Sequence, residues 1–202
     1  MRHELYDLNG NTIKIPVAEN YHDCMTLIKS DLYRITGRSL PTVSVLLYVL
    51  RPFHSSLLFW LRLAQYKGFL YPFCRFMYER ASRKAQVQIH PSTKIGYGLD
   101  IGHKICMVVS KKAVIGNNVN LSQFLNIGTN HRAPAIIGDN VYIAPHVCIV
   151  EDVRIENNAT IGAGAVITKD IPENSTAAGV PAKVLSYNNP GRYVKNRYPI
   201  PE

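Results

Sequence analysis

The sequence has few cysteines and no hydrophobic run long enough to span a membrane. Its 202 residues include four cysteines, at widely separated positions: Cys24, Cys74, Cys106 and Cys148. This spacing fits neither a disulfide framework nor a metal site, so we expect a reducing cytoplasm and no bound metal. The most apolar stretch, residues 43–63, is broken by Arg51, Pro52, His54 and Arg62. Either it forms buried helices, or it rests as an amphipathic segment on the inner membrane face.

Long runs of lysine or arginine are also absent, although the net charge is +9 and the pI is about 9.4. Dispersed basic charge argues against nucleic-acid binding and suits a polyanionic cofactor or an acidic polymer. The length fits one domain with an appendage, and 47% hydrophobic residues fit a soluble protein with a buried core.

What the sequence does contain is an aliphatic residue at nearly every sixth position. The series is Ile89, Ile95, Ile101, Met107, Ile115, Leu121, Ile127, Ile137, Ile143, Ile149, Ile155, Ile161 and Ile167. Neither an α-helix nor a flat strand keeps one face on a period of six. A hexapeptide period is typical of a parallel β-helix, in which each short strand forms one side of a triangular prism.

Residue pairs suited to tight corners support this interpretation. They are Tyr97-Gly98, Asn117-Asn118, Asp139-Asn140 and Asn157-Asn158. Their spacings are 20, 22 and 18 residues, and each becomes 18 if two insertions are subtracted. We place an insertion of two residues between Met107 and Ile115, and one of four between Ile127 and Ile137. The larger insertion must leave the prism as a loop, where a functional site is expected.

The chain divides into three predicted regions. They are an N-terminal helical region (1–87), the β-helix (88–172) and an extended C-terminal tail (173–202). In the first region, apolar residues at helical spacing predict a helix over residues 21–36, which Gly37 ends. Pro41 and Pro52 begin further segments, and the apolar stretch 57–66 is expected to be buried between helices or subunits. The fold class is therefore mainly β, with helices covering the first coil of the β-helix.

Three segments carry a resemblance to a known family. They are Ile89-His90-Pro91-Ser92-Thr93-Lys94-Ile95-Gly96, Ile101-Gly102-His103, and Ala177-Ala178-Gly179-Val180-Pro181-Ala182-Lys183. Over residues 57–185 the chain resembles the left-handed β-helix acyltransferases, most closely their serine acetyltransferase branch. The resemblance implies a left-handed coil, a trimer or dimer of trimers, and transfer of an acetyl group from acetyl-CoA to a hydroxyl group.

The resemblance also implies roles for two histidines. His103 corresponds to the general base, and histidine has the pKa to take a proton from a hydroxyl group at neutral pH. His131 corresponds approximately to a second active-site histidine, and either of the two could be the main base. Counting hexads puts them on different sides of the prism, so a neighbouring subunit is expected to bring them together. Gln88 stands where the family has an acidic residue that orients the base.

For acetyl-CoA the resemblance points to six residues: Ala144, Ala163, Thr168, Lys169, Gly179 and Lys183. The small residues among them permit close approach of the pantetheine arm, and the lysines can pair with phosphates. Without the resemblance, these would be ordinary corner and surface residues. The C-terminal tail is expected to complete this acetyl-CoA site.

Three departures from the family concern the acceptor. Gln88 cannot stabilise a protonated base by charge, Gly102 replaces an acidic residue that helps hold serine, and Asn130 replaces a basic residue. Arg132 lies two places from Asn130 and could take over its role. Since both charges of a free amino acid lose partners, we expect a sugar hydroxyl of a surface polysaccharide or its precursor as acceptor. L-Serine is the alternative acceptor, and a non-catalytic β-helix scaffold is a third possibility.

Overall fold

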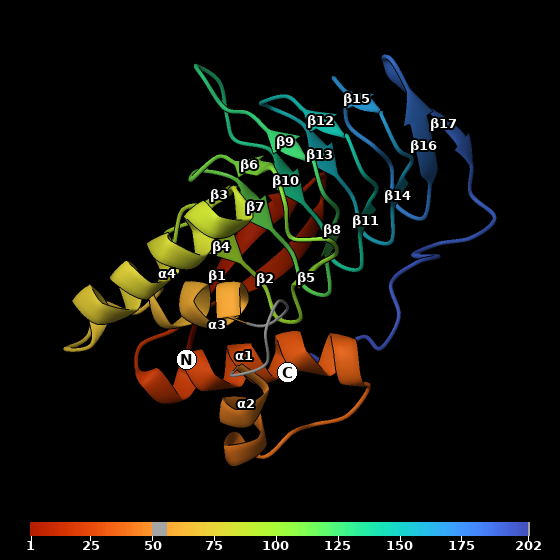
Figure 1. Cartoon of the computed structure of the whole chain (residues 1–202). Coiled ribbons are helices and arrows are strands. Elements are labelled where there is room, and N and C mark those ends of the chain that lie inside the picture. The colour runs from red at the N-terminus through yellow and green to blue at the C-terminus, as the bar shows by residue number, and fades with distance from the viewer. Residues whose placement is uncertain (50–55, 202) are drawn as a thin grey trace.

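A β-hairpin, helices and a parallel β-helix follow one another along the chain (Figure 1). The computed structural model describes residues 1–49 and 56–201. The hairpin consists of β1 (Arg2–Leu8) and β2 (Asn11–Val17), which pair antiparallel. The helices are α1 (Tyr21–Thr36), α2 (Thr42–Val49), α3 (Ser56–Leu63) and α4 (Tyr71–Ala85).

Helix α1 has the bounds that the sequence predicts. The side chain of Asn20 caps its first turn by accepting a hydrogen bond from the N–H of Asp23, and Gly37 ends it with a φ of 68°. Helix α3 is buried against the first coil, as its apolar composition predicts. Pro52 and part of the apolar stretch 43–63 lie outside the described residues. Among the helices of the described part of the chain, none is long and apolar enough to cross a membrane.

The β-helix has three faces, each a parallel sheet. The four-stranded sheet contains β4 (Lys94–Ile95), β7 (Val114–Ile115), β10 (Ile136–Ile137) and β13 (Arg154–Ile155). The five-stranded sheet contains β3 (Val87–Ile89), β6 (Met107–Val109), β9 (Asn126–Ile127), β12 (Cys148–Ile149) and β15 (Val166–Ile167). The six-stranded sheet contains β5 (Asp100–Ile101), β8 (Asn120–Leu121), β11 (Tyr142–Ile143), β14 (Thr160–Ile161), β16 (Thr176–Gly179) and β17 (Ala182–Ser186), of which only β17 runs antiparallel to its neighbour. The predicted fold class is confirmed.

All residues of the predicted hexad series are buried, but one of them does not occupy the expected register. Ile89 pairs with Val109, and Val109 pairs with Ile127, so Val109 holds the hexad position assigned to Met107. The two-residue insertion therefore lies between Ile101 and Val109, and its predicted place after Met107 is wrong. Both Met107 and Val109 point inward, because residues two apart in a strand share a face. The shift has a consequence for the site, since the enlarged corner is the one that carries His103.

A ladder of side chains joins the coils at the corner between the four- and six-stranded sheets. The Oδ1 atom of Asn117 accepts from the backbone N–H of Tyr97 at 2.9 Å, and that of Asp139 accepts from Asn117 at 2.7 Å. Asn157 does the same for Asp139 at 2.7 Å. The next residue in each coil has a positive φ, as the predicted corner pairs require. We call Asn117, Asp139 and Asn157 the corner ladder.

The hairpin covers the outer face of the four-stranded sheet. Leu8, Ile13 and Ile15 pack against Val114, and Lys94 forms a 2.8 Å ion pair with Glu4. A two-stranded hairpin is marginal by itself, so this apolar contact stabilises it. The N-terminal region thus contains a β-hairpin besides the predicted helices.

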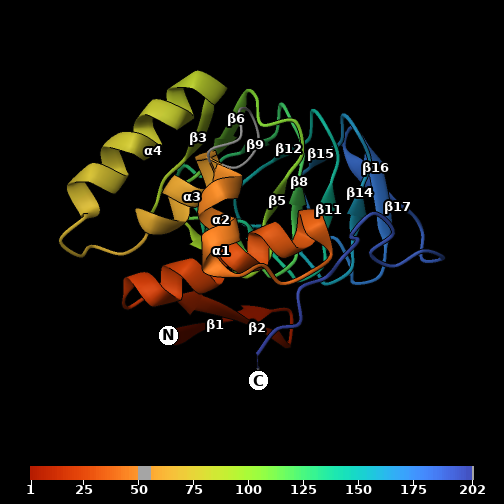
Figure 2. The same cartoon turned by 60° about the horizontal axis from the view of Figure 1, so that its bottom comes forward.

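The C-terminal tail folds back along the prism and ends near α1 (Figure 1, Figure 2). Gly191 donates its N–H to the carbonyl of Asn158 at 2.7 Å, and Tyr198 donates to Oδ1 of Asn118 at 2.8 Å. Arg34 of α1 donates from Nε to the carbonyl of Lys195 at 2.9 Å. The tail therefore runs along the edge of the prism that carries the corner ladder, from the last coils back to the first.

Candidate active site

His103 lies at the corner between β5 and β6, where the six-stranded sheet passes into the five-stranded sheet. Its side chain is exposed and its φ is 45°, in the left-handed region. The residue before it, Gly102, donates its N–H to Leu121 of the next coil at 2.9 Å. We call the stacked corners between these two sheets the His103 edge.

Small residues follow one another along the His103 edge. The N–H of Ala144 donates to Ile161 at 3.1 Å, and that of Gly162 donates to Ala177 at 2.8 Å, which stacks these corners in register. Ala163 follows Gly162 in its corner, and Gly179 ends β16 one coil further along. The structure thus brings together His103, Gly102, Ala144, Ala163 and Gly179 of the predicted site residues. Side chains this small leave room for an extended chain such as pantetheine beside the prism.

Two aromatic residues on the same edge have no counterpart among the predicted site residues. The rings of Phe124 and His146 stack at a centroid distance of 4.5 Å and an interplanar angle of 13°. Both side chains are exposed, and both residues have a φ of 60°. The equal φ values reflect equivalent places in adjacent coils, which a hexad count could have revealed. The stacked pair forms an aromatic wall on the His103 edge.

His131 lies at the opposite edge of the five-stranded sheet. It belongs to the loop of residues 128–135 between β9 and β10, together with Asn130 and Arg132, and all three side chains are exposed. The two histidines therefore lie at different corners of the prism, and the predicted separation is confirmed within one subunit. Thr168 and Lys169 follow β15 and lie on the same edge as His131, whereas Lys183 lies on β17. The predicted acetyl-CoA residues therefore divide between the two edges and the terminal strand.

The loop that carries His131 is anchored by one carboxylate that the sequence did not single out. Oε2 of Glu151 accepts hydrogen bonds from the backbone N–H groups of Asn130 at 2.5 Å, His131 at 2.8 Å and Arg132 at 3.0 Å. These bonds, led by that from Arg132, lower the pKa of Glu151 below its ordinary value. Beneath the loop lies a pocket of about 320 Å³, lined by Glu151, Asn130 and Cys148 among others.

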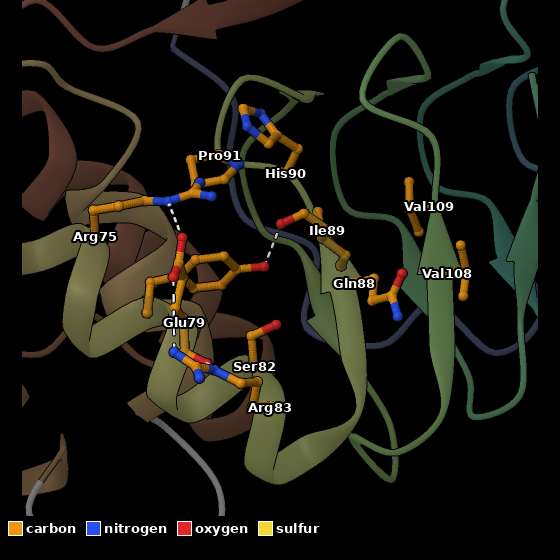
Figure 3. Close-up of a pocket in the computed structure, with 11 residues that line it drawn as sticks. Arg75, Glu79, Ser82, Arg83, Gln88, Ile89, His90, Pro91, Val108 and Val109 are labelled. Atoms are coloured by element: carbon orange, nitrogen blue, oxygen red, sulfur yellow. Dashed lines mark hydrogen bonds and ion pairs between the residues drawn. The ribbon is translucent and has the colours of Figure 1, made fainter.

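Gln88 lies in a different pocket, of about 410 Å³, between α4 and the start of the β-helix (Figure 3). Arg75 and Glu79 of α4 line it and form a 2.7 Å ion pair. His90 lines it as well, and burial, followed by the charge of Arg75, lowers the pKa of that imidazole. Within the described residues, no hydrogen bond joins Gln88 to His103. That Gln88 orients the base stays a prediction.

Comparison with known proteins reveals the same fold in serine acetyltransferases. Residues 134–169 match the family model "Bacterial transferase hexapeptide (six repeats)". The chain is 34% identical to the serine acetyltransferase of Escherichia coli K12 over 114 residues, which are 54% of this chain and 42% of that protein. The serine acetyltransferase of Staphylococcus epidermidis is 33% identical over 125 residues, which are 59% of this chain and 58% of that protein. The chain thus spans less than two thirds of either relative.

The solved structure of Neisseria gonorrhoeae serine acetyltransferase in complex with serine is 30% identical, with a TM-score of 0.64, and the match covers 82% of this chain and 70% of that one. The chain belongs to the left-handed β-helix acyltransferases, in their serine acetyltransferase branch. A coenzyme A complex of the Brucella abortus serine acetyltransferase is 25% identical with a TM-score of 0.63, over 79% of this chain and 66% of that one.

These relatives correct the prediction about the acceptor. The expectation of a polysaccharide hydroxyl is wrong, because the similar proteins are serine acetyltransferases and one of the similar structures holds serine. The departures at Gly102 and Asn130 removed charged partners at two positions, but they did not identify a sugar. The loss of charged partners at these two positions does not exclude serine, because other residues can bind its charged groups.

Proposed function

We propose that the protein is an acetyl-CoA-dependent O-acetyltransferase whose acceptor is L-serine. The observation that supports this most directly is the position of His103 at the head of a row of small residues, Ala144, Ala163 and Gly179. The row suits the pantetheine arm of acetyl-CoA and directs its thioester toward the imidazole. The similarity to a serine-bound structure supports the acceptor.

In this proposal His103 is the general base. An alcohol is a weak nucleophile at neutral pH, so a base must take its proton as the oxygen attacks. The serine oxygen forms a bond to the acetyl carbon of the thioester, and the proton passes to the imidazole of His103. When the tetrahedral intermediate collapses, the C–S bond breaks and the CoA thiolate leaves. The proton on the imidazole can then neutralise that thiolate.

The acceptor's charges require partners other than those at Gly102 and Asn130. Arg132 is exposed on the loop of His131, and its guanidinium can bind the serine carboxylate with two parallel hydrogen bonds. Lys183 is proposed to hold the phosphates of acetyl-CoA, and Thr168 and Lys169, which lie on the edge of His131, would do so from the neighbouring subunit. These three side chains are exposed near the last coils.

The proposed active form is a trimer or a pair of trimers in the cytoplasm. His103 and His131 lie at opposite edges of the five-stranded sheet of one subunit. If both take part in one reaction, the corner of one subunit must meet the loop of its neighbour. The site would then be shared between two copies of the chain.

The test is release of free CoA from acetyl-CoA with matched acceptors. L-Serine carries a hydroxyl group and both charges, L-alanine lacks the hydroxyl group, and glycerol lacks the charges. We expect saturable CoA release with L-serine and formation of O-acetylserine, with background rates for the other two. Equal rates with L-serine and glycerol would contradict an amino-acid acceptor, and no turnover with any hydroxyl compound would contradict the proposed activity.

A further inference from the structure

The backbone N–H groups of the His131 loop form a binding site for one negatively charged group. Three consecutive N–H groups, those of Asn130, His131 and Arg132, converge on Oε2 of Glu151 within 3.0 Å. Successive amides that point to one place make an anion-binding concavity. Hydrogen bonds to an ionised acceptor are roughly twice as strong as neutral ones. The Glu151 carboxylate therefore stabilises the conformation in which these three N–H groups converge.

Within the described part of the chain, few other contacts order residues 130–133. Its side chains at positions 130 to 133 are exposed, so apolar burial does not hold this part in place. The N–H of Asp152 donates to the carbonyl of Ala133 at 2.8 Å, and this bond ties the far end of the loop to the same corner of the next coil. Without such bonds, the conformational entropy lost on ordering a loop outside the prism would not be offset.

The carboxylate of Glu151 is ionised at neutral pH. The N–H groups lower the pKa of Glu151, which keeps the charged form present at neutral pH. The anchoring interaction is thus complete under physiological conditions and would weaken only in acid.

We propose that Glu151 is a positioning residue that holds His131 and Arg132 in their working places without touching the substrate. The loop ordering follows from the hydrogen bonds alone, whereas the effect on turnover rests on the proposed acetyl transfer. A displacement of about 1 Å in a catalytic group can lower the rate on the order of 100-fold. A residue that fixes the backbone of His131 is therefore expected to matter for kcat.

Local opening of the loop can be measured by the rate of tryptic cleavage, because trypsin cuts after Arg132. We expect cleavage at this bond to rise about tenfold or more in Glu151→Ala, since local opening controls proteolysis. The exposed Arg192 gives an internal standard within the same digest. Asp152→Asn is the matched control, because it removes the same charge from the next residue while keeping the N–H that bonds Ala133 and a residue type that tolerates its φ of 60°. Glu151→Gln, which keeps an acceptor oxygen without the charge, should give an intermediate cleavage rate.

The second readout is acetyl transfer by the same variants. We expect kcat to fall about 10- to 100-fold in Glu151→Ala, less in Glu151→Gln and not at all in Asp152→Asn, with one thermal unfolding midpoint for all three. Unchanged cleavage at Arg132 in Glu151→Ala, or an equal rise in Asp152→Asn, would overturn the anchoring role. Faster cleavage with an unchanged kcat would overturn the positioning role. An inactive wild type with the cleavage contrast intact would contradict the proposed acetyl transfer and support the anchor.

Discussion

Asp31 and Arg62 form a bidentate ion pair that is buried between the helices and the β-helix. Arg62 donates from Nε and Nη2 to the two carboxylate oxygens of Asp31 at 2.8 and 2.9 Å. The side chain of Arg62 is 0% exposed and that of Asp31 is 3% exposed. Nη2 also donates to the carbonyl of Gly96 at 2.7 Å, and Asp31 accepts from the N–H of Leu99 at 2.8 Å. The pair therefore joins α1 and α3 to the first coil.

Removal of one partner should be costly, because the other charge would remain buried and unpaired. We expect Arg62→Ala to lower the free energy of unfolding by about 3–5 kcal/mol. Urea unfolding at one fixed protein concentration measures this, with the exposed Arg38→Ala as control. A loss below about 1 kcal/mol, the range of surface ion pairs, would show that the buried pair does not hold the helices.

His103→Ala should reduce acetyl transfer by about two to four orders of magnitude, which is the range for a positioned general base. The side chain is exposed, so its loss should leave the unfolding midpoint unchanged. His22→Ala on the exposed side of α1 is the matched control and should keep full activity. Near-normal turnover by His103→Ala would transfer the role of base to His131.

Mixed oligomers test whether the site is shared. His103→Ala and His131→Ala should each be nearly inactive alone. Subunits unfolded and refolded together should regain a fraction of the wild-type rate, since some interfaces then combine an intact His103 with an intact His131. Mixed assemblies verified by mass spectrometry that stay inactive would argue for sites within single subunits.

Asp139→Asn should stabilise the protein at neutral pH. Burial raises the pKa of Asp139, so the folded state binds its proton more tightly than the unfolded chain does. This contribution to stability is present below the ordinary aspartate pKa of about 3.9 and is lost as pH rises through the folded-state pKa. Asparagine performs the same hydrogen bonding at Asn117 and Asn157 in the corner ladder.

Thermal unfolding at several pH values checks this prediction. The variant should melt above the wild type at pH 7, and the difference should shrink as the pH falls toward 4. Asp152→Asn, on an exposed corner, controls for the loss of one negative charge. A variant that melts below the wild type at pH 7 would show that the ladder needs a charged acceptor at this position.

The repeat was predictable from sequence because each coil places one aliphatic residue inside the prism. Its phase near Met107 was not, since Met107 and Val109 are both inward and both apolar. The hairpin did leave a signal, because Asn9 and Gly10 stand between two alternating segments and both have positive φ. This turn lies outside the six-residue period, which begins only at Ile89.

The site was predictable only as far as residues match a motif. His103 follows a recognisable segment, and the position of its edge relative to Ala144 follows from counting coils. The contact of Glu151 with the loop of His131 joins residues 19 to 21 positions apart, and the bonded groups of the loop are backbone amides. Backbone groups carry no side-chain identity, so neither composition nor motif can reveal such a partner.

The hairpin decides which side of the prism remains open to another copy of the chain. β1 and β2 occupy the outer face of the four-stranded sheet, and the tail occupies the edge beyond it. The five-stranded sheet, in contrast, presents an exposed row of outward residues: Gln88, Val108, Asn126 and Cys148. In the proposed trimer this row would form part of the contact between subunits, and His103 and His131 lie along its two borders. The N-terminal seventeen residues thus cover the four-stranded face and leave the five-stranded face, whose two borders carry His103 and His131, open to the neighbour in the proposed trimer.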